Sequence, residues 1–112
     1  MADKYGKIAK IFKALSDPKR VQILDLLSKG EVCACTLLEH FHISQPTLSH
    51  DMRLLIDVEV VKSRRDGQRM LYSLDMDTLR EMQRQLLKII EDNSGPSQEE
   101  SAPEQQSGGA AG

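Results

Sequence analysis

The chain has 112 residues, of which 39% are hydrophobic and 29% charged, which suits a single soluble globular domain. No apolar run approaches the roughly 20 residues needed to cross a bilayer, and the N-terminus lacks the apolar stretch of a signal peptide. These features predict a cytoplasmic protein with no membrane partner. Residues 1–92 hold all 15 basic but only 14 of the 17 acidic residues, a balance too weak to indicate nucleic-acid binding by itself.

The first 30 residues predict two helices. The first, about residues 4–15, presents one apolar face. Its members are Tyr5, Ile8, Phe12 and Leu15. Asp17 is a suitable cap for the second helix, and Pro18 suits its first position, where a missing N–H costs nothing. Gly30 is expected to end this second helix.

The next segment predicts two helices joined by a tight turn at His42-Ile43. The third helix covers about residues 33–41, and Ser44 or Gln45 caps the fourth. Apolar residues of the fourth helix recur at helical spacing and should face the core: Leu48, Met52 and Leu55. Its opposite face is polar and offers partners for base edges or phosphates: Gln45, Thr47, Ser49, His50 and Arg53.

A β-hairpin follows, with Asp66-Gly67 as its turn because both residues tolerate positive φ. Four cations cluster on it: Lys62, Arg64, Arg65 and Arg69. Asp75 or Asp77 is expected to cap a last helix that reaches about Glu91. Residues 93–112 contain no aromatic or branched aliphatic residue, and we predict a disordered acidic tail there.

Together these elements predict a mainly α fold with a small β-hairpin, a winged helix-turn-helix, in residues 1–92. The fourth helix would enter the major groove, and the cationic hairpin would lie beside the phosphate backbone. The first and last helices are expected to pair in a homodimer, which would read an inverted repeat in double-stranded operator DNA. One alternative is a solvated helix beside a surface hairpin, and another is a winged-helix interaction module that never contacts DNA.

Cys33 and Cys35 are the only cysteines, and two thiolates in one segment can chelate a soft ion. Residues i and i+2 do not share a face of an α-helix. Chelation therefore requires the first turn of the third helix to be non-helical or to distort, which would disturb the DNA-reading helix resting on it. The alternatives are two small buried hydrophobic residues, or zinc, which wants four ligands. A disulfide would be strained, and cytoplasmic thiols stay reduced.

At these residues the chain resembles the arsenical-resistance repressor family (ArsR/SmtB). The matching segments are 14–20 (ALSDPKR), 31–37 (EVCACTL), 44–50 (SQPTLSH) and 65–68 (RDGQ). The resemblance implies a homodimeric winged-helix repressor of a metalloid-resistance operon, with Cys33 and Cys35 as ligands of the inducer, trivalent arsenic or antimony. It also places Ser44 in the DNA-reading motif.

The chain departs from the family at two positions. Leu38 stands where some members have a third cysteine, and Thr36 replaces a common aspartate. A water, hydroxide or small thiol would then fill the third place, or the inducer is a trivalent organoarsenical that needs only two sulfurs. The last helix lacks the histidines of the family's zinc sensors, so we predict no zinc site there.

No catalytic motif is present, so we predict that the chain is not an enzyme and needs no cofactor to fold. The leading hypothesis is a repressor released from DNA by arsenic or antimony. The alternative is a winged-helix DNA-binding regulator with a redox response or with none.

Overall fold

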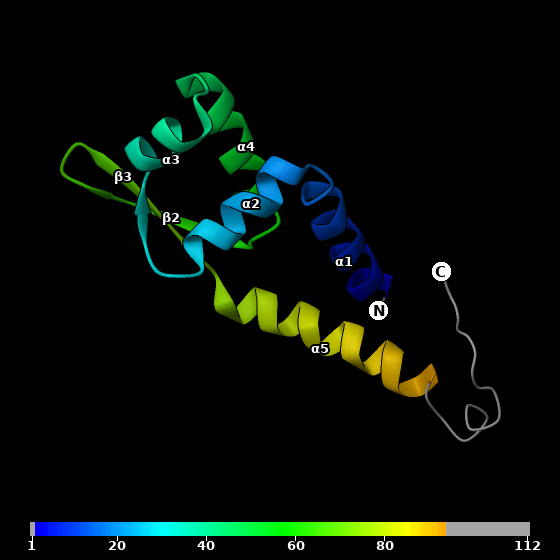
Figure 1. Cartoon of the computed structure of the whole chain (residues 1–112). Coiled ribbons are helices and arrows are strands. Elements are labelled where there is room, and N and C mark those ends of the chain that lie inside the picture. The colour runs from blue at the N-terminus through cyan, green and yellow to red at the C-terminus, as the bar shows by residue number, and fades with distance from the viewer. Residues whose placement is uncertain (1, 94–112) are drawn as a thin grey trace. The chain divides into compact units, whose positions relative to one another are not determined.

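The computed structural model describes residues 2–93 (Figure 1). In chain order the elements are α1 (Ala2–Ala14), α2 (Pro18–Leu27), β1 (Val32–Cys33), α3 (Ala34–Phe41), α4 (Gln45–Asp57), β2 (Val61–Asp66), β3 (Arg69–Leu74) and α5 (Met76–Asn93). The chain divides into two compact units, the first ending at Leu79 and the second beginning at Arg80, within α5. The predicted tail lies outside the described residues, apart from Asn93, where α5 ends. Among residues 2–93, no helix is long and apolar enough to cross a membrane.

Helix α1 contacts the core with different residues from those expected. Ile11 and Ala14 are buried, whereas Tyr5 is 67% and Phe12 47% exposed. The predicted apolar face therefore exists as a sequence pattern but remains largely uncovered in a single chain. The start of α2 agrees with prediction, since the Asp17 side chain accepts a hydrogen bond from the backbone N–H of Lys19 at 3.2 Å.

Helices α3 and α4 form the predicted helix-turn-helix. His42 ends α3 in the left-handed conformation, with φ of 53°, and Ser44 caps α4 through a hydrogen bond from the Thr47 backbone N–H at 3.3 Å. The core-facing residues of α4 are buried as predicted: Leu48, Met52 and Leu55. They lie in one core with residues of α2, α3 and the sheet, such as Ile23, Leu37 and Leu71. Because its apolar side is packed in the core, α4 presents its polar face to solvent.

The sheet has three antiparallel strands in the order β1-β3-β2, whereas the sequence predicted only a hairpin. The extra strand, β1, is two residues long and pairs Val32 with Tyr72 and Cys33 with Leu71. It was missed because two residues cannot display the alternating pattern of a strand. The same pairing corrects the start of the third helix, which begins at Ala34 instead of Cys33.

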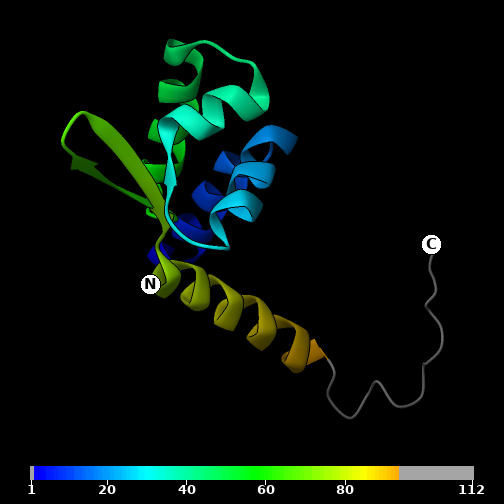
Figure 2. The same cartoon turned by 60° about the vertical axis from the view of Figure 1, so that its left-hand side comes forward.

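Strands β2 and β3 form the predicted hairpin, called the wing below, which extends away from α2, α3 and α4 (Figure 1 and Figure 2). Its turn is shifted by one residue from the prediction, because Asp66 pairs with Arg69 and leaves Gly67-Gln68 as the two-residue loop. Gly67 has φ of 64°, which suits the first position of a type II′ turn. The wing cations thus lie on the strands that flank this turn.

Helix α5 begins as predicted. The Asp75 side chain accepts a hydrogen bond from the Thr78 backbone N–H at 3.3 Å, which makes Asp75 the capping residue in preference to Asp77. The described part of the second unit, residues 80–93, continues α5.

Candidate functional site

The outward face of α4 carries the residues predicted to read DNA. All of them are exposed: Ser44, Gln45, Thr47, Ser49, His50 and Arg53. Two of them also form the helix cap, because the Ser44 hydroxyl donates to Thr47 Oγ1 at 3.0 Å while accepting from the Thr47 backbone N–H. Gln45, Ser49 and Arg53 have side chains that can reach base edges or phosphates from this face.

A buried carboxylate, which sequence reasoning missed, anchors α4 to α2. Asp51 is 3% exposed, and its Oδ1 accepts a hydrogen bond from Arg20 Nη1 at 3.1 Å. Its Oδ2 has no hydrogen-bond partner but lies 2.8 Å from Lys19 Nζ, so an ion pair compensates its charge. Arg20 is itself held by the Ala14 carbonyl at 2.6 Å and by Asp17 at 3.4 Å. The orientation of α4, the helix predicted to read DNA, therefore depends on a charge network beneath it.

The predicted wing cations are not equivalent. Arg64 donates two hydrogen bonds to Glu31, at 2.7 and 2.8 Å, and this contact lowers the pKa of the Glu31 carboxyl. Arg65 and Arg69 are exposed and form no ion pair among the described residues. Of the three arginines predicted to contact DNA on the wing, Arg65 and Arg69 are thus the ones whose charge is available to phosphate.

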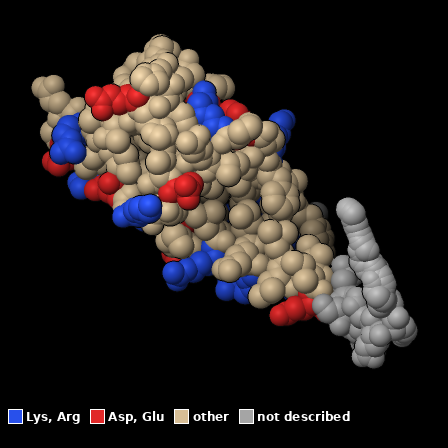
Figure 3. Space-filling view, viewed as in Figure 1, with Lys and Arg blue, Asp and Glu red and all other residues tan. Residues whose placement is uncertain are grey.

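The wider surface mixes both signs of charge. On the face shown in Figure 3, Lys and Arg side chains are interspersed with Asp and Glu side chains. Attraction to nucleic acid through that face cannot come from a broad positive field. It requires local cations such as those of the wing.

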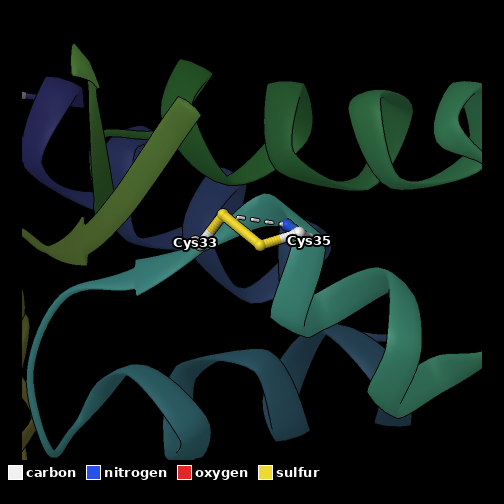
Figure 4. Close-up of a disulfide and its surroundings, with 2 residues drawn as sticks. All are labelled: Cys33 and Cys35. Carbon is white, nitrogen blue, oxygen red and sulfur yellow. Dashed lines mark hydrogen bonds between the residues drawn. A yellow bond between two sulfur atoms is a disulfide. The ribbon is translucent and has the colours of Figure 1, made fainter. Parts of the chain in front are cut away.

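The two cysteines meet where β1 passes into α3 (Figure 4). Cys33 has extended backbone angles and caps α3, because its Sγ accepts a hydrogen bond from the Cys35 backbone N–H at 3.2 Å. Cys33 is buried and Cys35 is exposed. Their Cα atoms lie 5.2 Å apart, and their sulfur atoms are joined in a disulfide.

This geometry corrects one expectation and decides between the alternatives of another. The pair was expected to be reduced, yet the structure joins the two sulfurs. Chelation was expected to need a first turn of the third helix that is non-helical or distorted. The non-helical alternative holds, because Cys33 lies before α3 with extended backbone angles, so both sulfurs reach one point while α3 stays intact. Only the start of the third helix differs from the prediction, because Cys33 precedes the helix as its cap.

The sulfurs lie in a pocket of about 350 Å³, which we call the thiol pocket. Its walls come from β1, α3, α4 and the wing, all within the first unit. They include Cys33, Cys35, Gln45, Ser49, Arg65, Gln68, Arg69, Met70 and Tyr72. At the wall, burial raises the pKa of the Tyr72 hydroxyl, and the charge of Arg65 acts in the opposite direction. Residues predicted for two separate tasks, thiol chemistry and DNA contact, therefore share one pocket.

A multidentate site of hard or borderline ligands is not evident. Within residues 2–93, no three His, Cys, Asp or Glu side chains are grouped closely enough to hold a metal ion. Once the disulfide is reduced, the pocket instead offers two sulfur donors. Two soft donors without further protein ligands fit a thiophilic species that brings its remaining ligand with it.

Comparison with known proteins identifies the family. The model of the arsR family of bacterial regulatory proteins matches residues 17–63. The arsenical resistance operon repressor of Staphylococcus xylosus is 55% identical over 75 residues, which make up 67% of this chain and 72% of that protein. The chain belongs to the arsR family. This arsR-family chain is also 42% identical over 80 residues to the transcriptional repressor SdpR of Bacillus subtilis, covering 71% of the chain and 89% of SdpR.

A solved structure shares the fold. The homodimeric winged helix-turn-helix DNA-binding domain Mb0332 of Mycobacterium bovis has a TM-score of 0.66 and 29% identity, over 82% of the arsR-family chain and 84% of that domain. The predicted winged helix-turn-helix fold is confirmed. The arsR-family chain is an ArsR-type transcriptional repressor and not an enzyme, as predicted.

Proposed function

We propose that the chain represses an operon by binding an inverted repeat in operator DNA as a homodimer, and that it leaves the DNA when Cys33 and Cys35 capture trivalent arsenic or antimony. The observation that carries the proposal is the convergence of two sulfurs in a pocket whose walls include DNA-contacting candidates. The arsenical resistance operon repressor that the chain resembles supports the choice of metalloid.

On the DNA side, α4 lies in the major groove and the wing lies against the backbone. The exposed side chains of α4 supply base-edge and phosphate contacts: Ser44, Gln45, Thr47, Ser49, His50 and Arg53. Arg65 and Arg69 neutralise phosphates, and Arg64 contributes less because Glu31 holds it. The buried Asp51 keeps α4 in register for these contacts.

On the inducer side, each thiol replaces one hydroxyl of trivalent arsenic and releases one water. The residues fit a two-sulfur species, and the pocket must accommodate its third ligand, because Leu38 stands where some relatives would supply another thiol. The species is arsenite or antimonite with water, hydroxide or a small thiol, or a trivalent organoarsenical. Capture requires the reduced pair, so a thiol reductant of the cytoplasm, where we propose that the chain resides, first opens the disulfide.

The dimer would form through α1 and α5. The exposed Tyr5 and Phe12 of α1 need a cover, and α5 carries half-exposed Leu87 and Ile89. Such a dimer has two-fold symmetry, so its operator would contain two inverted half-sites about one or two helical turns of DNA apart.

The proposal is tested with an operator duplex selected from a randomised pool by the reduced full-length chain. Fluorescence anisotropy of the labelled duplex is followed as arsenite or antimonite is added. We expect full release from the wild type and none from Cys33→Ser or Cys35→Ser, with Thr36→Ser as the control that still responds. Release that persists in both cysteine variants would exclude the thiols as the sensor.

The disulfide favours a second candidate function, a redox-responsive repressor. In that case operator affinity would differ between the reduced and the oxidised chain, and arsenite would have no effect on the reduced chain. Measuring the same duplex with the chain held in each redox state separates the two candidates.

A further inference from the structure

The thiol pocket is lined by positively charged side chains in addition to the two cysteines. The residues that line it include two arginines, Arg65 and Arg69, and no Asp or Glu. Gln45, Gln68 and Ser49 add side chains that can donate hydrogen bonds. A pocket of about 350 Å³ with this lining is large enough for a small organic ligand and favours an anion.

The two sulfurs determine where such an anion would be attached. Trivalent arsenic forms three bonds, and Cys33 and Cys35 supply two of them, so a third arm remains on the arsenic. Because Cys33 and Cys35 line the pocket, the third substituent of an arsenic atom bound to them would lie inside the pocket.

We propose that this third arm is anionic and is held by Arg65 and Arg69, so that the site selects trivalent arsenicals carrying a carboxylate over neutral ones. The inference rests on the proposed role of Cys33 and Cys35 as inducer ligands. A neutral arm offers these exposed guanidinium groups no acceptor and leaves them to water, whereas a carboxylate accepts charge-assisted hydrogen bonds from them.

Arg65 and Arg69 line the thiol pocket together with the two cysteines. The charge of Arg65 lowers the pKa of Tyr72, which lines the same pocket, against the effect of burial. The two arginines are also the wing cations available to phosphate. An anionic third substituent would therefore bind the same two arginines that we propose contact the phosphates of the operator.

Arsenic stays trivalent throughout the binding reaction. A dithiol such as dithiothreitol first reduces the disulfide and is itself oxidised. Each cysteine thiol then displaces one hydroxyl from an arsonous acid, so that two As–S bonds form, two As–O bonds break and two waters leave. The carboxylate takes no part in this exchange and contributes only through the arginines.

The test compares 4-carboxyphenylarsine oxide with phenylarsine oxide, each in competition with dithiothreitol. Native mass spectrometry of the full-length chain, without DNA, gives the fraction that carries each arsenical. We expect the wild type to bind the carboxylate probe about tenfold more tightly than the neutral one, as two charge-assisted hydrogen bonds would allow. The preference should fall to about onefold in Arg65→Gln/Arg69→Gln and persist in Lys62→Gln, a wing cation that does not line the pocket.

The neutral probe reports separately on the thiols. Unchanged binding of phenylarsine oxide by the double arginine variant would show that its fold and cysteines are intact. Equal binding of both probes by the wild type would overturn the inference and leave the proposed function standing, as would a preference that survives in the double variant. Binding that survives Cys33→Ser and Cys35→Ser would overturn the proposed function and this inference with it.

Discussion

Cys33 combines two tasks at one atom. Its sulfur caps α3 by accepting the hydrogen bond from the Cys35 N–H, and the same sulfur forms one half of the thiol pair. Its backbone also belongs to β1, which pairs with the wing strand β3. In the proposed function, a ligand on this sulfur would therefore act on the start of α3 and on the wing at once, without any unwinding of the helix.

The capping role predicts a specific order of stabilities in the reduced chain. Cys33→Ala should lower the free energy of unfolding by about 1 kcal/mol, because the Cys35 N–H loses its acceptor. Cys33→Ser should stay near the wild type, because serine is a good helix cap. Cys35→Ala, at an exposed position, should change stability by less than about 0.5 kcal/mol. Urea unfolding of the three variants measures this order, and equal stability of Cys33→Ala and Cys33→Ser would argue against a capping sulfur.

The arginines of the wing also differ at the residue scale. Arg64 is held by Glu31 through two hydrogen bonds, while Arg65 has no ion pair among the described residues. Replacing Arg65 with Gln should reduce the slope of log affinity against log salt by about 0.9, the value for one lost phosphate contact. Arg64→Gln should leave the slope nearly unchanged. Operator titrations over a range of salt concentrations test this, and equal slopes in the two variants would contradict the distinction.

At the scale of elements, α4 is positioned by apolar packing and by one buried charge network. Its apolar residues face the core, and Asp51 connects it to Arg20 and Lys19 of α2. Both contacts lie beneath the exposed face that we propose reads DNA. The angle of that face is thus set by residues that never meet the operator.

Removing the Asp51 charge should expose this dependence. Asp51→Asn leaves Arg20 and Lys19 without their shared carboxylate, and loss of one partner of a buried ion pair costs about 3 kcal/mol. Asp57→Asn, at an exposed position of the same helix, is the matched control and should cost less than about 0.5 kcal/mol. Thermal or urea unfolding gives the comparison. A similar cost for the two variants would show that the network does not anchor α4.

Elements with local signals could be predicted from the sequence, and those without could not. The caps at Asp17 and Ser44 and the helical spacing of Leu48, Met52 and Leu55 are readable within a few residues of chain. Strand β1 is defined only by its pairing with β3, which lies almost 40 residues later. The Asp51–Arg20 contact spans 31 residues, so no local pattern reveals it.

The candidate site shows the same division. The polar face of α4, the cysteine pair and the wing cations could be predicted as separate groups. Their meeting in one pocket could not, because it depends on how α3, α4 and the wing pack together. The hydrogen bonds between Arg64 and Glu31 could not be predicted either, because 33 residues of chain separate the two side chains.

At the scale of the whole molecule, a single chain leaves apolar surface on α1. Phe12 is 47% exposed, which has no benefit in a monomer but suits an interface between two copies. A two-fold dimer would also supply the second DNA-reading helix that an inverted repeat requires.

A charge at this surface should separate the copies. Phe12→Glu is expected to shift the chain from dimer to monomer and to weaken operator binding. Val21→Glu is the control, because Val21 is 49% exposed but lies on α2, outside the proposed interface. Sedimentation velocity measures the masses. A Phe12→Glu variant that remains dimeric would exclude α1 as part of the interface.

The central claim is that filling the cysteine pair and leaving the operator are one event. The most direct measurement is a single arsenite titration of the reduced chain bound to labelled operator, with sulfur–arsenic absorption and DNA anisotropy recorded together. The account predicts that both signals change in parallel and saturate at one arsenic per chain. Release of DNA without a rise in sulfur–arsenic absorption, or absorption that saturates while the DNA stays bound, would contradict it.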